Sequence, residues 1–178
     1  MRQIVQATGS AAAETPWVPV SDSQNPFNVG LYGMYSQDFS GTGWTFQFSP
    51  DDPQTTRQVT ITATGTTATV TDVAHELKTG DSIVMTGTNS PLDTTPGAVD
   101  ITVTDNNTYT YTCGASPPAK AIGKVASMRV FNAPGTPPTT DRSSVLLQSP
   151  CRAVRAKLTG WVAGIFNLLV IQAASRTN

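Results

Sequence analysis

The C-terminal segment of the chain limits the possible folds more than any other part. It reads CRAVRAKLTGWVAGIFNLLVIQA over residues 151–173. From 154 to 159 the even positions are apolar and the odd positions are polar. This period of two predicts a β-strand and excludes an amphipathic helix, whose apolar residues recur every three or four positions.

The second half of this segment is apolar enough to raise the question of a membrane anchor. A membrane-spanning helix needs about 20 consecutive apolar residues. Only fourteen residues lie between Trp161 and Ala174, and Asn167 and Gln172 interrupt them. We therefore expect a terminal β-hairpin, with a turn through Gly160–Gly164 and no membrane contact. Its last strand is apolar on both faces, so its second face is covered by the chain itself or by another subunit.

Composition supports strands in the rest of the chain. Charged residues make up only 13% of the sequence. Threonine, glycine and proline replace them, and β-branched residues and turn formers favour strands over helices. The formal net charge of −1 gives no basic patch for nucleic acid or an anionic membrane. We expect an all-β protein with neither of these partners.

A compositional break divides the chain. Between residues 56 and 124 threonine is dense, and the aromatic residues are Tyr109 and Tyr111. Short strands at about every eight to twelve residues predict a small β-sandwich here. We expect an N-terminal arm (1–16), a host β-sandwich or jelly-roll-like domain (17–55 and 125–178), and an inserted Thr-rich module (56–124). The alternative is one large sandwich without a modular division.

Within the inserted module, one hairpin is predicted in detail. Residues 98–114 place three apolar residues of the first strand opposite three of the second, across a turn at Asp105-Asn106-Asn107. Asn and Asp tolerate positive φ, which such turns require. The predicted pairs are formed by Val99, Ile101 and Val103 with Tyr109, Tyr111 and Cys113. Residues 115–124, which include two prolines, are predicted to be a linker.

Residue types that carry catalysis are scarce. His75 is the only histidine, and we expect it to be structural, at a corner between a strand and a turn. Asp51-Asp52 lies between prolines and predicts a turn rather than a calcium or acid site. The two cysteines, Cys113 and Cys151, form no CxxC pair, so a zinc site is not expected. We expect both to be buried thiols, and a disulfide between them is the alternative. No phosphate-binding loop is present. These features predict a non-enzyme with no cofactor and no metal.

Four segments of the host domain carry a resemblance to a known group of proteins. They are "WVPVSDSQNPFNVGLYGMYS", "GWTFQFSPDDP", "VFNAP" and the C-terminal segment quoted above. Together they resemble small virion proteins of tailed bacteriophages over most of residues 17–55 and 130–173. The insert separately resembles the Ig-like modules of phage head and tail proteins, through "TVTDVAHELKTGDSIVMTG" and "VDITVTDNNTYTYTCG".

The resemblance implies a structural virion protein without catalytic positions. The first expectation is a capsid cement or decoration protein that binds the major capsid protein or other virion proteins and forms a homo-oligomer, a dimer or a trimer. A tail or head–tail joint accessory protein is the alternative. A glycan-binding module is a third possibility, which the scarcity of aromatic residues in the insert disfavours. Because the first 17 residues lack the apolar region of a signal peptide, we expect synthesis in the host cytoplasm and a place on the virion, most simply on the capsid surface.

Five apolar residues are candidates for the contact surface. Trp161 lies in the predicted turn and Trp17 at the start of the host domain, and large aromatic residues concentrate binding energy in protein interfaces. The others lie in the strand that is apolar on both faces. They are Ile165, Leu169 and Ile171.

Overall fold

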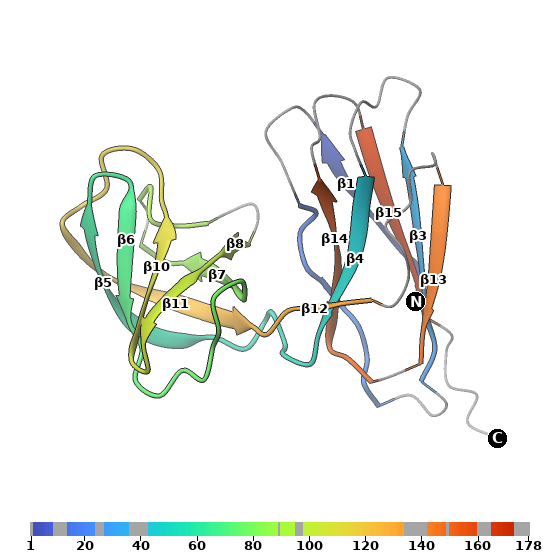
Figure 1. Ribbon diagram of the computed structural model, residues 1–178, viewed down its shortest axis with the longest axis horizontal. Helices are drawn as coiled ribbons and strands as arrows, with labels where there is room; N and C mark the ends of the chain where they lie inside the picture. The colour runs from blue at the N-terminus through green and yellow to red at the C-terminus, as the bar shows by residue number, and fades with distance from the viewer. Residues whose placement is uncertain are drawn as a thin grey trace. The chain divides into compact units, whose positions relative to one another are not determined.

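The computed structural model describes residues 2–8, 14–23, 27–35, 43–88, 90–94, 98–133, 142–148, 150–159 and 165–172. These residues form fifteen β-strands and no helix, which confirms the predicted all-β class (Figure 1). The chain divides into two compact units, a host unit (Met1–Pro50 with Phe131–Asn178) and an inserted unit (Asp51–Val130). The insert expected at 56–124 lies within the second unit.

The host unit is a sandwich of two antiparallel four-stranded sheets. The first sheet contains, in order, β1 (Arg2–Thr8), β15 (Ile165–Gln172), β3 (Val29–Tyr35) and β13 (Arg142–Leu147). The second contains, in order, β12 (Phe131–Asn132), β4 (Gly43–Ser49), β14 (Ala153–Thr159) and β2 (Val18–Pro19). Apolar side chains from both sheets form one core, which includes Leu31 and Phe166 of the first sheet and Trp44 and Val154 of the second.

The N-terminal segment differs from the arm predicted for residues 1–16. Residues 2–8 form β1, which pairs with β15 along its whole length, from Arg2 opposite Ile171 to Thr8 opposite Ile165. Further on, the Thr15 amide donates to the Ala156 carbonyl of β14. The segment is therefore part of both sheets. The segment has few apolar residues, so the sequence did not predict that it pairs with strands of the host unit.

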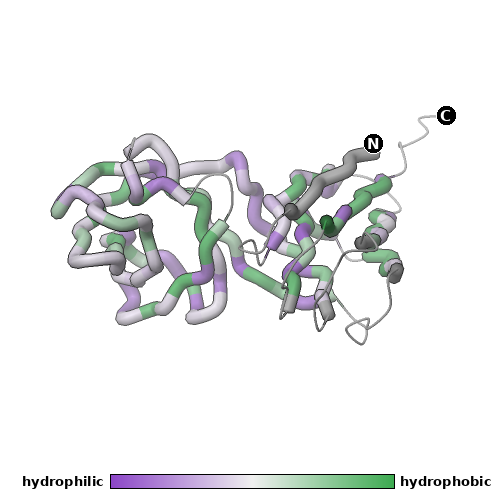
Figure 2. The backbone as a smooth tube through the Cα atoms, turned by 90° about the horizontal axis from the view of Figure 1, so that it is seen from above, coloured by the Kyte–Doolittle hydropathy of each residue, from purple (hydrophilic) through white to green (hydrophobic). Residues whose placement is uncertain are grey.

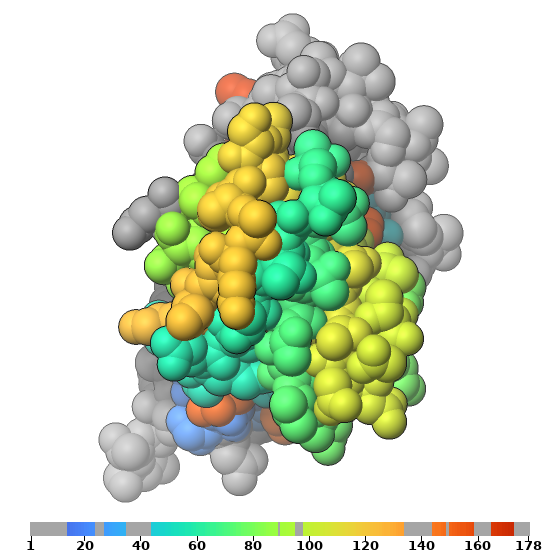
Figure 3. Space-filling model, turned by 90° about the vertical axis from the view of Figure 1, so that its left-hand side faces the viewer, coloured from blue at the N-terminus to red at the C-terminus, as the bar shows by residue number. Residues whose placement is uncertain are grey.

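In the inserted unit, seven strands form one nearly closed sheet. Its hydrogen-bonded order is β8 (Val99–Asp100), β7 (Ser82–Thr86), β11 (Lys120–Met128), β5 (Arg57–Thr64), β6 (Thr67–Thr71), β10 (Thr108–Thr112) and β9 (Thr102–Asp105). Figure 3 shows β11, β5, β6 and β10 side by side across one face, from orange through teal and green to yellow. Because only Ile101 separates β8 from β9, one stretch of chain pairs with β7 at its start and with β10 at its end.

This topology does not confirm the Ig-like assignment of the insert. An Ig domain packs two separate sheets face to face, whereas here the hydrogen bonds run through a single sheet. The unit has its own apolar core, distinct from the core of the host unit. That core includes Ile61, Val70, Ile83, Met85 and Tyr109.

Two detailed predictions for the insert are wrong. Val99 pairs with Ile83 of β7 rather than with β10, while Val103 does lie opposite Tyr109 as expected. The predicted linker 115–124 ends inside β11, a central strand between β7 and β5. At Gly123 an added Cβ would lie 2.8 Å from the Met85 Sδ atom, so glycine allows this strand to approach its neighbour closely.

The distribution of hydropathy fits the strand assignment. Figure 2 shows hydrophobic and hydrophilic residues interspersed along the backbone rather than gathered in one long apolar segment. Within the described residues, no helix is long and apolar enough to cross a membrane.

Candidate functional site

The last strand, β15, presents different residues to its two sides. Phe166, Leu168 and Val170 are buried in the core, and Ile165 and Ile171 are exposed on the opposite side. The predicted double-sided apolar strand thus has one covered face and one face open to solvent. Leu169 lies on the open face and is half-buried.

Neighbouring strands extend this apolar surface. Ile171 lies opposite Gly30 of β3, which lies opposite Leu146 of β13, and Leu169 lies opposite Tyr32. Residues paired across antiparallel strands share one face of the sheet. We call the resulting surface the outer face. Its large apolar residues are Tyr32 (41% exposed), Leu146 (58%), Ile165 (42%), Ile171 (40%) and the half-buried Leu169.

Tyr32 is the aromatic residue of the outer face, and its position depends on Gly30. A Cβ added at Gly30 would lie 3.0 Å from Cε2 of the Tyr32 ring, so the ring lies along its own strand over the glycine. The exposed ring offers an aromatic contact area of the kind enriched in protein interfaces.

Trp17 lies away from the outer face. Its side chain is only 8% exposed, and the Arg155 guanidinium lies over the indole, with Cζ 4.6 Å from the ring centroid. Trp161, the other predicted aromatic contact, lies outside the described residues. Of the five candidates, the structure therefore brings together Ile165, Leu169 and Ile171.

Arg155 is fully buried, although the alternation of β14 predicts a polar, outward-facing residue. Its guanidinium donates to Gln47 Oε1 at 2.8 Å and forms an ion pair with Glu14. The chain around Glu14 and Trp17 covers this side of the strand, and it supplies both the carboxylate and the ring that a buried guanidinium needs. The sequence pattern did not reveal this partner because Glu14 is far away along the chain.

In the inserted unit, the most unusual backbone surrounds His75. Ala74 and Glu76 have φ values of +54° and +57°, in the left-handed region that residues with a side chain rarely adopt. Asn107, in the turn at 105–107, supports this corner. Its carbonyl accepts a hydrogen bond from the Asp72 amide, and its Oδ1 accepts one from the Ala74 amide. Three other left-handed positions of this unit are glycines, namely Gly65, Gly80 and Gly87.

The His75 ring supports the same corner from inside. Its Nδ1 accepts a hydrogen bond from the Leu77 amide at 3.0 Å, so Nε2 carries the proton and donates to the Asp105 carbonyl at 2.9 Å. The ring also packs edge-on against Tyr109. Among the described residues Cys113 is not a partner of His75, and this arrangement fits the structural role predicted for the histidine.

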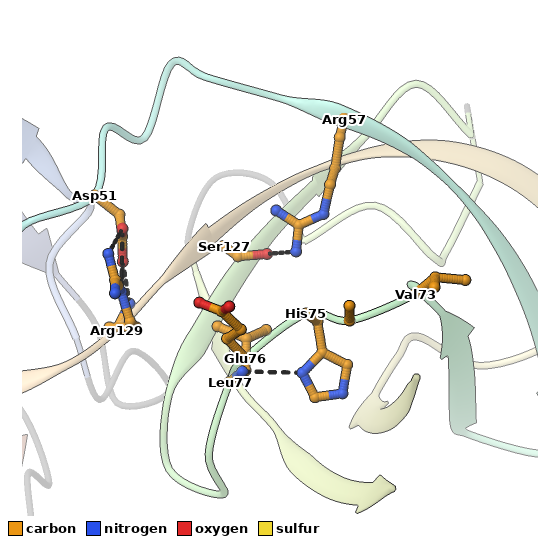
Figure 4. Close-up of a pocket in the computed structure, with 9 residues that line it drawn as sticks. Asp51, Arg57, Val73, His75, Glu76, Leu77, Ser127 and Arg129 are labelled. Atoms are coloured by element: carbon orange, nitrogen blue, oxygen red, sulfur yellow. Dashed lines mark hydrogen bonds and ion pairs between the residues drawn. The ribbon is translucent and has the colours of Figure 1, made fainter. Parts of the chain in front are cut away.

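A polar pocket of about 360 Å³ opens beside this corner (Figure 4). Two arginines on its wall are fixed by carboxylates. Arg57 makes two hydrogen bonds to the buried Asp72, at 2.7 and 2.5 Å, and a third to Ser127 Oγ at 2.9 Å. The rest of the lining is formed by Asp51, Val73, Ala74, His75, Glu76, Leu77, Ser127 and Arg129.

Arg129 is the second arginine of the polar pocket. Its Nη2 and its backbone amide each donate to the Asp51 carboxylate at 2.7 Å. Hydrogen bonds to Asp72 and Asp51 raise the pKa of Arg57 and Arg129 above the ordinary guanidinium value. Figure 4 shows the Glu76 side chain on the same side of the corner as Ser127 and Arg129.

The other acidic candidates form turns, as predicted. Asp52 Oδ1 accepts from the Gln54 amide at 2.8 Å and closes the turn after β4. Asp105 accepts from the Asn107 amide at 2.7 Å and from the Thr108 hydroxyl at 2.6 Å. These two bonds, chiefly the one from Thr108, hold the pKa of Asp105 below its ordinary value. Neither Asn106 nor Asn107 has a positive φ.

Both cysteines are free and buried, as predicted. Burial raises the pKa of the Cys151 thiol to about 12 and also raises that of Cys113. Because the thiolate is the reactive form, a raised pKa lowers the reactivity of both thiols. Among the described residues, no group of His, Cys, Asp and Glu is arranged to hold a metal ion.

The protein is thus all-β, with an apolar outer face on the host unit and a polar pocket in the inserted unit. No protein-family model and no curated protein matches the chain. Among solved structures it is similar to the phage phi92 endosialidase, with 16% identity and a TM-score of 0.35 over 57% of this chain. The match spans 18% of that protein's chain. A TM-score this low does not define a shared fold or a shared activity.

Proposed function

We propose that this chain is a structural protein of a tailed-phage virion, and that it binds the assembled head as a cement or decoration protein. The outer face carries the proposal. Three of its residues come from the one strand that the sequence predicts to be apolar on both sides, and an exposed apolar patch of this kind is typical of a protein-binding surface. The resemblance of residues 17–55 and 130–173 to small virion proteins supports the phage setting.

The occupant we propose for the outer face is the protein shell of the head. Tyr32 and the two isoleucines, Ile165 and Ile171, are the anchors, since aromatic and large apolar side chains at the centre of an interface contribute most of its energy. A protein that binds only the assembled shell stabilises that state by mass action. A non-enzymatic role agrees with His75, whose two ring nitrogens are both engaged by backbone groups.

Copy number separates a place on the head from a place on the tail. A closed symmetric shell repeats the same site many times, so on the order of hundreds of copies per particle are expected. Quantitative mass spectrometry of purified particles measures this number. A copy number of about a dozen or fewer contradicts head decoration and favours the tail or the head–tail joint.

A further inference from the structure

The polar pocket of the inserted unit is built from groups that the proposed head-binding surface does not use. Its hydrogen-bonding groups come from segments far apart in sequence, because Arg57 and Ser127 are 70 positions apart. Each guanidinium is held in one orientation by its own carboxylate. On each arginine, Nη1 has no acceptor among the described residues and remains available to a ligand. Pre-oriented donors lose little conformational freedom on binding, and this favours recognition.

The balance of charges in the polar pocket limits what it can bind. Two arginines and two carboxylates line it, so the formal charges of the lining cancel. A metal cation would be repelled by Arg57 and Arg129, and an anion by Asp51 and Glu76. The apolar lining is restricted to Val73, Ala74 and Leu77, and the lining includes no Phe, Tyr or Trp ring on which an apolar ligand could stack. The arginines donate hydrogen bonds and the carboxylates accept them. Because a hydroxyl group can do both, this lining suits a neutral ligand with several hydroxyl groups.

The backbone at Glu76 gives a second, independent indication. A non-glycine residue in the left-handed region is strained, and such residues cluster at binding sites. Glycine would remove that strain at position 76, as it does at Gly65, Gly80 and Gly87. The chain instead has a glutamate there. Its carboxylate lines the pocket and makes no hydrogen bond or close ion pair with the described residues. The strain thus holds a free acceptor beside the two arginines.

We propose that the polar pocket is a binding site for a neutral saccharide unit. The Glu76 carboxylate accepts from adjacent hydroxyls, and the free edges of Arg57 and Arg129 donate to hydroxyl or ring oxygens. Recognition is by hydrogen bonds to fixed side chains rather than by stacking on aromatic rings. The pocket volume of about 360 Å³ is at the lower end of the range for small-molecule sites, roughly 300–1,000 Å³. The proposal is independent of head binding.

Amide NMR spectra of the full-length ¹⁵N-labelled chain test this proposal. The probes are glucose, galactose, mannose and N-acetylglucosamine, with sodium phosphate and calcium chloride as charged comparisons. At least one sugar is expected to shift the signals of Ala74, Glu76, Ser127 and Arg129 in a saturable way, with Kd on the order of 1–10 mM for so open a site. No saturable shift with any of the four sugars, or a shift only with phosphate or calcium, overturns the proposal.

Two variants separate ligand binding from backbone strain. Glu76→Gly removes the acceptor and relieves the left-handed strain, so it is expected to keep the fold and to weaken sugar binding by about tenfold or more. Ser116→Gly is the matched control, because Ser116 is also left-handed, with φ of +59°, and does not line the pocket. It is expected to leave sugar affinity unchanged. Equal affinity in Glu76→Gly and the wild-type chain overturns the assignment of Glu76.

Discussion

At the scale of single residues, the host core depends on one missing side chain. Gly33 of β3 lies against Trp44, and an added Cβ would be 2.1 Å from Cη2 of the indole. Trp44 is fully buried and packs edge-on against Phe46 and Phe166, so its ring has little room to move. The backbone conformation at Gly33 does not require glycine, but the Trp44 ring leaves no space for a larger side chain.

Gly33→Ala is therefore expected to destabilise the host unit. Overpacking of a closed core typically costs about 1–3 kcal/mol, and this contact is closer than any real Cβ contact, so the cost should be at or above the upper end. Urea unfolding followed by tryptophan fluorescence measures the change. Gly30→Ala on the same strand is the control, because its Cβ would meet only the exposed Tyr32 ring, at 3.0 Å. Similar losses in the two variants would contradict the packing argument.

The charged residues show what a sequence can and cannot predict at this scale. The turn at Asp52 and the place of His75 at a corner after a strand follow from local residue types, and the structure has both. The burial of Arg155 and the polar pocket could not be predicted. Their contacts join residues far apart along the chain, such as Glu14 with Arg155, and no local pattern encodes such pairs.

At the scale of elements, the strand β15 shows when a sequence pattern cannot identify the buried face of a strand. Alternation in β14 predicted the buried positions Val154, Ala156 and Leu158, and all three are buried. In β15 both parities are apolar, so the pattern could not say which face is covered. Packing against the second sheet decides it, and the even-numbered residues form the core.

A pair of substitutions in β15 tests this division of faces. Leu168→Ala removes a fully buried side chain and is expected to cost about 2–5 kcal/mol in the free energy of unfolding. Ile171→Ala removes a side chain that is exposed, and its cost is expected to be below about 1 kcal/mol. Urea unfolding of the two variants makes the comparison. Equal costs would mean that the outer face is covered in the folded chain.

The turn between β9 and β10 is expected to respond to acid. The pKa of Asp105 is lowered from 3.8, chiefly by the Thr108 hydroxyl. A carboxylate with a lowered pKa in the folded state contributes stability above its unfolded pKa, and this contribution is lost as pH falls through the folded pKa. NMR titration of Asp105 should therefore give a pKa below 3.8 in the wild-type chain and a value closer to 3.8 in Thr108→Val. An unchanged pKa in the variant would exclude the Thr108 hydroxyl as the cause.

At the scale of the whole molecule, the division into two units has a direct consequence. The inserted unit, Asp51–Val130, contains its own core, and its seven strands bond to one another. The compositional break around residues 56–124 indicated an insert. The nearly closed sheet could not be predicted, because the sequence of β11 does not resemble a central strand. The two prolines just before that strand and the lysines within it are typical of a linker.

The fragment 51–130 is expected to fold by itself. Domains of this size bury somewhat more than about 60% of their unfolded surface, so a cooperative but modest stability is predicted. Circular dichroism should show β-structure and a single urea transition, and the amide spectrum should overlay that of the full chain for the residues around His75. A disordered fragment would contradict the assignment of an independent core.

The proposed binding of the outer face to the phage head can be measured directly. Co-sedimentation of the purified chain with heads that lack it measures this binding, and the key variant carries Ile165→Glu and Ile171→Glu. Both side chains are exposed, so the variant is expected to fold as the wild-type chain does, whereas two charges on an apolar contact surface weaken binding by at least about a hundredfold. The wild-type chain is expected to sediment with heads to saturation, and the folded variant is expected to stay in the supernatant. Equal sedimentation of the two, or none by the wild-type chain, would contradict the proposed binding.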